Sequence, residues 1–157
     1  MKQKLEWIVK NIARYIDIKF LVKKIAIFIF SGLIAVAPIF FVCLGQVSTQ
    51  KEAFNTVQLL TKMESSTDVV YALVSLSTIV LADVLEDEKS KNTAKFISGL
   101  FHVITVVFGI LIYAHYKTHN VDAYSVKMLN GFCAIVVFGL SFLSYINLSI
   151  TEKRKEG

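Results

Sequence analysis

Four long apolar runs dominate the pattern of the chain, at residues 25–45, 69–85, 96–116 and 129–150. The first, third and fourth contain no Lys, Arg, Asp or Glu, and the second contains one acid, Asp83, near its end. A helix needs about 20 apolar residues to cross a hydrocarbon core about 30 Å thick. We therefore predict an all-α integral membrane protein with four transmembrane helices. The second run is short, and we expect Asp83 and Glu86 to reach the membrane surface from its end. A soluble bundle is disfavoured, because its helices would each carry a polar face.

A basic segment, residues 1–24, precedes the first run. Its apolar positions recur at helical spacing, and its charged residues lie on the opposite face. We predict an amphipathic helix over residues 1–24 that lies in the membrane interface, preceding a transmembrane domain of residues 25–150 and a basic tail of residues 151–157. Its bases are expected to contact anionic lipid headgroups or an acidic partner, unless the helix only anchors the first span. The docking candidates here are Lys2, Lys4, Lys10 and Arg14.

The distribution of bases predicts the orientation. Of the 17 Lys and Arg residues, 13 lie before the first run, between the second and third runs, or in the tail. The remaining four lie in the other two connections. Cytoplasmic connections carry the excess of Lys and Arg, so we expect both termini in the cytoplasm and the protein in the inner membrane.

Charged residues of both signs gather on this cytoplasmic side. Acids at the end of a helix oppose its macrodipole, so a compensating base is expected nearby, although a solvated charge run is the alternative. The acids form no calcium-binding loop pattern, and we expect no metal and no cofactor. The acidic candidates are Glu86, Asp87 and Glu88, and the basic tail candidates are Lys153, Arg154 and Lys155.

Polar residues inside the last three runs recur at helical spacing. We expect these stripes to form the seam of the bundle and the interface of a homo-oligomer, because small and hydroxyl side chains allow close helix packing in lipid. The alternative is a polar relay centred on His102, since an ionisable residue inside a membrane is a functional candidate. The stripes contain Tyr71, Ser75 and Thr78 in the second run, Ser98, His102 and Thr105 in the third, and Ser141 and Ser144 in the fourth.

The long connection at residues 46–68 carries two local signals. Phe54, Val57 and Leu60 recur every three residues and predict a short amphipathic helix on the outer surface. The run from Ser65 to Asp68 predicts the N-cap of the second span. The two cysteines, Cys43 and Cys133, are expected to be free thiols, although a disulfide is the alternative.

Common enzyme motifs are missing from the sequence, including H-E-x-x-H, G-x-S-x-G, the P-loop and G-x-G-x-x-G. We expect no enzyme, and no nucleic-acid binding because the basic patch lies against the membrane. We expect a sensor or anchor subunit that oligomerises and signals to, or recruits, a cytosolic protein. The alternative is a pore-related protein, either a holin-like pore former or an immunity protein against a pore-forming bacteriocin.

In outline, the whole chain resembles the small four-span membrane subunits of bacterial anti-phage defence systems such as Kiwa. The resemblance rests on the four runs, the basic leader from Lys2 to Lys24 and the short tail. It implies a homo-oligomeric inner-membrane sensor in antiviral defence, paired with a cytosolic effector, and it carries over no functional residue. Four-span colicin immunity proteins have a similar outline.

Overall fold

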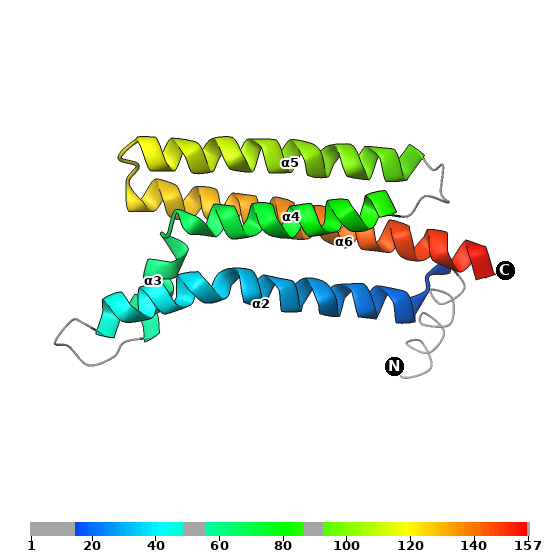
Figure 1. Cartoon of the computed structure of the whole chain (residues 1–157), viewed down its shortest axis with the longest axis horizontal. Coiled ribbons are helices and arrows are strands. Elements are labelled where there is room, and N and C mark those ends of the chain that lie inside the picture. The colour runs from blue at the N-terminus through cyan, green and yellow to red at the C-terminus, as the bar shows by residue number, and fades with distance from the viewer. Residues whose placement is uncertain (1–14, 49–55, 87–92, 157) are drawn as a thin grey trace, which may run out of the picture.

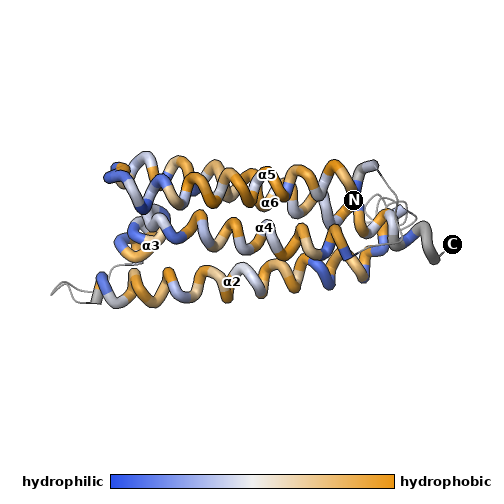
Figure 2. Tube along the Cα trace, turned by 45° about the horizontal axis from the view of Figure 1, so that its top comes forward, coloured by the Kyte–Doolittle hydropathy of each residue, from blue (hydrophilic) through white to orange (hydrophobic). Residues whose placement is uncertain are grey.

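The computed structural model describes residues 15–48, 56–86 and 93–156, and within these ranges the regular structure is entirely helical. The helices are α2 (Ile18–Ser48), α3 (Thr56–Glu64), α4 (Asp68–Glu86), α5 (Thr93–Thr118) and α6 (Ala123–Glu156). All but α3 are long and apolar enough to cross a membrane, as the hydropathy colouring in Figure 2 shows. The prediction of an all-α protein with four transmembrane helices is confirmed. The first 14 residues of the predicted interfacial helix lie outside the described residues.

Each long helix extends beyond the apolar run that predicted it. Helix α2 begins at Ile18 rather than at residue 25, so residues 18–24 continue the first span. Its start is capped by Asp17, whose Oδ1 accepts the Phe20 N–H at 3.0 Å. Helix α6 begins at Ala123 rather than at residue 129 and continues through the predicted tail to Glu156. Asp122 caps it by accepting the Ser125 N–H at 2.9 Å, and the Ser125 hydroxyl and amide hold the pKa of Asp122 below its usual value.

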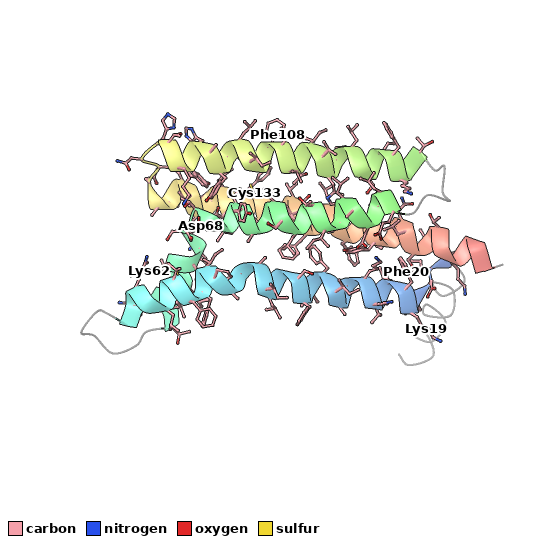
Figure 3. All side chains as sticks on the ribbon, viewed as in Figure 1. Lys19, Phe20, Lys62, Asp68, Phe108 and Cys133 are labelled. Atoms are coloured by element: carbon pink, nitrogen blue, oxygen red, sulfur yellow. The ribbon has the colours of Figure 1, made fainter. Side chains whose placement is uncertain are left out.

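Helices α4 and α6 lie between α2 and α5 (Figure 1). The starts of α2 and α5 and the ends of α4 and α6 meet at one end of the bundle, which we call the terminal end. Helix α3 and the α5–α6 turn lie at the other end, the α3 end. In Figure 3, Phe20 marks the terminal end, whereas Lys62 and Asp68 mark the α3 end. This arrangement puts both ends of the described chain on the same side, as four consecutive membrane crossings require.

Two apolar clusters attach α2 to the rest of the bundle. In the first, the Phe28 ring contacts Tyr145 of α6 edge-on, with ring centroids 6.0 Å apart. In the second, Leu59 of α3 packs against Ile39 and Cys43 of α2. The predicted short helix is therefore present, and it packs on α2 through Leu59, a residue outside the apolar stripe that predicted it. Leu59 is 5% exposed, whereas Val57 is 69% exposed, and Phe54 lies outside the described residues.

Candidate functional site

A polar cluster centred on His102 of α5 lies inside the bundle. The His102 side chain is fully buried, and its ring contacts hydroxyls on two other helices. The distance from Nδ1 to the Ser77 Oγ of α4 is 2.9 Å, and the distance from Nε2 to the Ser144 Oγ of α6 is also 2.9 Å. Ser98, one turn before His102, forms a hydrogen bond with the same Ser144 hydroxyl. One side chain thus joins α4, α5 and α6.

A neutral imidazole satisfies this network completely. The Ser144 hydroxyl donates to the Leu140 carbonyl at 2.8 Å, which leaves its oxygen free to accept from His102 Nε2–H. Nδ1 of the ring then carries the lone pair and accepts from the Ser77 hydroxyl. This assignment of protons follows from the partners, because only one arrangement gives each donor an acceptor. The cluster is therefore suited to holding three helices in register without a buried charge.

The polar stripes on α5 and α6 face the bundle interior as predicted. Ser141 and Ser144 are buried, and Ser98 and Thr105 are partly buried beside His102. The Thr105 hydroxyl donates to the Phe101 carbonyl of its own helix, so Thr105 makes no hydrogen bond across helices.

The stripe predicted for α4 does not lie in the seam of the bundle. Tyr71 is 61% exposed, Thr78 is exposed, and the Ser75 hydroxyl donates to the Tyr71 carbonyl of its own helix. The polar contact that α4 makes with the His102 cluster comes from Ser77, which lies outside the predicted stripe. Ser77 shares its face with buried apolar residues at a spacing of three or four, and this spacing is the signal that could have found it. Those neighbours are Val70, Leu73, Val80 and Val84.

A second polar cluster, the Asp83 junction, joins α2, α4 and α6 near the terminal end. Asp83 of α4 forms an ion pair with Lys24 of α2 and accepts a hydrogen bond from the Tyr145 hydroxyl of α6 at 3.1 Å. The Lys24 and Asp83 side chains are only 21% and 15% exposed, and Tyr145 is 1% exposed. The predicted contact between a base of the leader and an acid near the end of the second span is therefore present for this pair.

The other docking candidates are mostly outside this junction. Glu86 is exposed at the end of α4, and Lys153, Arg154 and Lys155 belong to the last turns of α6. The remaining candidates lie outside the described residues, namely Lys2, Lys4, Lys10, Arg14, Asp87 and Glu88.

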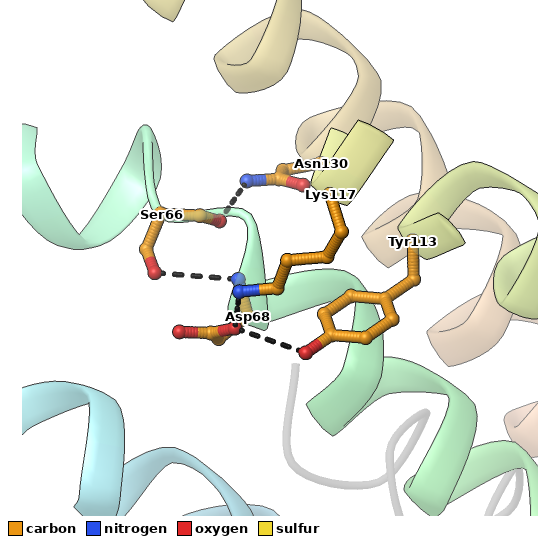
Figure 4. A network of polar contacts seen from close by, with 5 residues as sticks. All are labelled: Ser66, Asp68, Tyr113, Lys117 and Asn130. Carbon is orange, nitrogen blue, oxygen red and sulfur yellow. Dashed lines mark hydrogen bonds and ion pairs between the residues drawn. The ribbon is translucent and has the colours of Figure 1, made fainter. Parts of the chain in front are cut away.

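A third set of contacts fixes the α3 end (Figure 4). Lys117 of α5 forms an ion pair with Asp68 at 3.1 Å, and Asn130 of α6 donates to the Ser66 carbonyl at 2.9 Å. The Ser66 hydroxyl accepts the Asp68 N–H at 3.3 Å, so a serine of the predicted run does cap α4. The Asp68 and Lys117 side chains are about half exposed, so we assign their pair no more than about 1 kcal/mol.

An apolar crevice of about 280 Å³ lies where α5 and α6 meet over α4. Phe108 and Cys133, labelled in Figure 3, lie on its walls. Gly109 also lines it, and a Cβ atom at Gly109 would lie 2.3 Å from Val74 Cγ2. Both cysteines are free thiols, because Cys43 packs between α2 and α3 whereas Cys133 lies on this crevice.

No protein-family model, curated protein sequence or solved structure matches this chain significantly.

Proposed function

We propose that this chain is a non-enzymatic sensor or anchor subunit of the inner membrane, with both termini in the cytoplasm. It oligomerises and passes a signal to, or recruits, a cytosolic protein, and phage defence is the setting that its outline suggests. The observation that carries the proposal is the Asp83 junction, which connects the start of α2 to α4 and α6. The four docking bases precede α2 in the sequence, and Lys24 of this junction lies in the first turns of α2.

The packing of α2 supports a role in signalling. Between its two contacts with the bundle, most large side chains of α2 are exposed, including Phe30, Leu33 and Ile34. By contrast, α4, α5 and α6 share the His102 cluster in their middle. A force on the leader would therefore act on α2, on the Lys24–Asp83 pair and on the bonds between the Asp17 backbone and Ser149 of α6. In an oligomer, the exposed side of α2 is also available to pack against a neighbouring chain.

The proposal is tested by combining a topology measurement with partner capture. A reporter fused after Gly157 should give a cytoplasmic signal, and a periplasmic signal would contradict the proposed orientation. Replacing Lys2, Lys4, Lys10 and Arg14 with Gln should abolish co-purification of a cytosolic partner without reducing membrane insertion. The matched control replaces Lys62 and Lys127, bases of the opposite end, with Gln, and it should leave capture unchanged. Equal capture by all three proteins would refute the docking role of the leader.

The pore-related alternative gives a different result in the same preparation. Purified protein in planar bilayers would conduct ions if it formed a pore, and it would suppress the conductance of an added bacteriocin if it were an immunity protein. A sensor subunit should do neither.

A further inference from the structure

Two histidines lie one turn apart where α5 ends, at the α3 end of the bundle. The backbone N–H of His119 donates to the His115 carbonyl at 3.0 Å, so helical spacing continues through both residues. A separation of four residues places both side chains on one face of the helix. Their rings are stacked, with centroids 4.4 Å apart and an interplanar angle of 22°, and both residues are exposed.

The partners of His119 determine which of its ring nitrogens is free. Nδ1 lies 2.8 Å from the Thr118 hydroxyl oxygen and 3.3 Å from the His115 carbonyl. The Thr118 hydroxyl itself donates to the Ala114 carbonyl at 3.0 Å, so its oxygen is left to accept. Both partners of Nδ1 are then acceptors, which places the proton on Nδ1. In the neutral ring, Nε2 therefore carries the unshared electron pair, and the ring is exposed.

The partners of His119 favour a cationic ligand over an anionic one, because they leave Nε2 without a proton donor role. A transition-metal ion binds the lone pair of an imidazole nitrogen, whereas an anion needs N–H donors. Two histidines at a separation of four on one helix face also provide the paired ligands of helical zinc motifs.

We propose that His115 and His119 form a binding site for a divalent metal ion of the Zn²⁺ class, with water in the remaining coordination positions. In the described ranges, no group of three or more His, Cys, Asp or Glu side chains gathers to hold a metal. The site is therefore open and exchangeable, unlike the closed four-ligand sites of structural zinc. The charge of the neighbouring Lys117 is compensated by Asp68, which reduces its repulsion of a cation.

Metal binding requires a small movement of the two rings. Zinc bonds to histidine nitrogen are about 2.0–2.1 Å long, so Nε2 of His119 and one ring nitrogen of His115 must approach one ion, and the near-parallel rings must tilt toward each other. Because both side chains are exposed, this tilt sacrifices little packing. The Thr118 contact holds the His119 tautomer during the movement, as outer partners of zinc-bound histidines do.

The test is calorimetric titration of Zn²⁺ into the full chain, purified in detergent without a polyhistidine tag. We expect one ion bound per chain, and at least tenfold weaker binding in His115→Ala and in His119→Ala. The double variant gives the level of non-specific binding. The matched control combines His119→Ala with Asn120→His, which keeps the number of histidines but changes their separation to five residues, and it should bind no better than the single variants.

Two results would overturn the proposal. One is wild-type protein that binds Zn²⁺ no more tightly than the double alanine variant. The other is a control with the five-residue separation that binds as tightly as the wild type. A Thr118→Val variant adds a further measurement, because loss of the hydroxyl should weaken binding while both ligands remain.

Discussion

Replacing His102 with Ala tests whether the buried polar cluster holds the bundle together. The change removes the ring that contacts Ser77 on α4 and Ser144 on α6, both at 2.9 Å. It also leaves a space at a fully buried position. The Ser144 hydroxyl keeps its bond to the Leu140 carbonyl, so the cost comes from the interhelical contacts and from the lost ring.

The expected loss of stability is about 3 kcal/mol. Interhelical hydrogen bonds in membrane proteins average about 0.6 kcal/mol each, so the two lost bonds contribute about 1 kcal/mol. Large-to-small changes in the packed interiors of soluble proteins cost about 2–5 kcal/mol, part of which is the free energy of moving the side chain out of water. Lipid makes that part smaller, so we assign about 2 kcal/mol to the loss of the ring. His102→Leu fills most of the space and should therefore lose only the contribution of the hydrogen bonds, about 1 kcal/mol.

Unfolding in mixed micelles with increasing sodium dodecyl sulfate, followed by far-ultraviolet circular dichroism, measures these differences. Thr105→Ala is the matched control, because the Thr105 hydroxyl bonds only to its own helix and its loss should change stability by less than about 0.5 kcal/mol. A His102→Ala variant that is no less stable than Thr105→Ala would show that the cluster does not hold the helices together. A His102→Leu variant that is as stable as the wild type would show that the two interhelical hydrogen bonds contribute nothing to stability.

Two further substitutions probe the contacts between helices. Gly109→Ala places a Cβ atom 2.3 Å from Val74 Cγ2 and should destabilise the protein by about 1–3 kcal/mol in the same unfolding assay. Gly131→Ala is the control, because its new Cβ atom would meet no other atom within 4 Å, and it should be neutral or stabilising. Equal stabilities of the two variants would show that α4 and α5 do not approach each other closely at Gly109. Asp83→Asn leaves the Lys24 ammonium without its carboxylate at a partly buried position, so proteolysis near the start of α2 should accelerate at least fivefold. The double change Lys24→Met with Asp83→Leu removes both charges and should restore part of the protection against proteolysis. Unchanged proteolysis of Asp83→Asn would show that the pair does not hold α2.

The four spans were predictable because the solvent imposes them. A backbone in hydrocarbon must satisfy its own hydrogen bonds, so long uncharged runs form helices whatever their neighbours are. The ends were less predictable, because charged residues are tolerated once the helix leaves the hydrocarbon. Lys19, Lys23 and Lys24 therefore continue α2 before its apolar run begins. In the same way, α6 continues through its basic end.

The inward faces were predictable only where polar residues mark them. On α5, His102 identifies the interior, because an ionisable side chain in lipid needs partners. On α4, the stripe of Tyr71, Ser75 and Thr78 does not mark the bundle interior, because serine and threonine can satisfy themselves on the preceding turn of their own helix. A tyrosine near a membrane surface is also stable facing lipid headgroups. The buried face of α4 is mostly apolar, and in lipid that composition does not separate an inside from an outside.

The positions of the polar contacts explain which helix can move. Apolar packing between helices is weak in lipid, since acyl chains compete for the same surfaces, so polar contacts determine how the helices are held. Helices α4, α5 and α6 share such contacts in the middle of the bundle at His102, and again at the α3 end through Asp68 and Asn130. Among the described contacts, the ion pair that holds α2 to α4 lies near the terminal end, at Lys24. Just before α2, the Asp17 backbone also bonds to Ser149 of α6. Rotation or tilting of α2 about this end therefore leaves the His102 cluster intact, whereas movement of α4, α5 or α6 would break it. A spin label on the exposed face of α2, at Leu33, should accordingly show a broader distance distribution to a label at Phe142 of α6 than an equivalent pair between α5 and α6. Equal widths would place α2 in the same rigid unit as the other three helices and would remove it as the moving element.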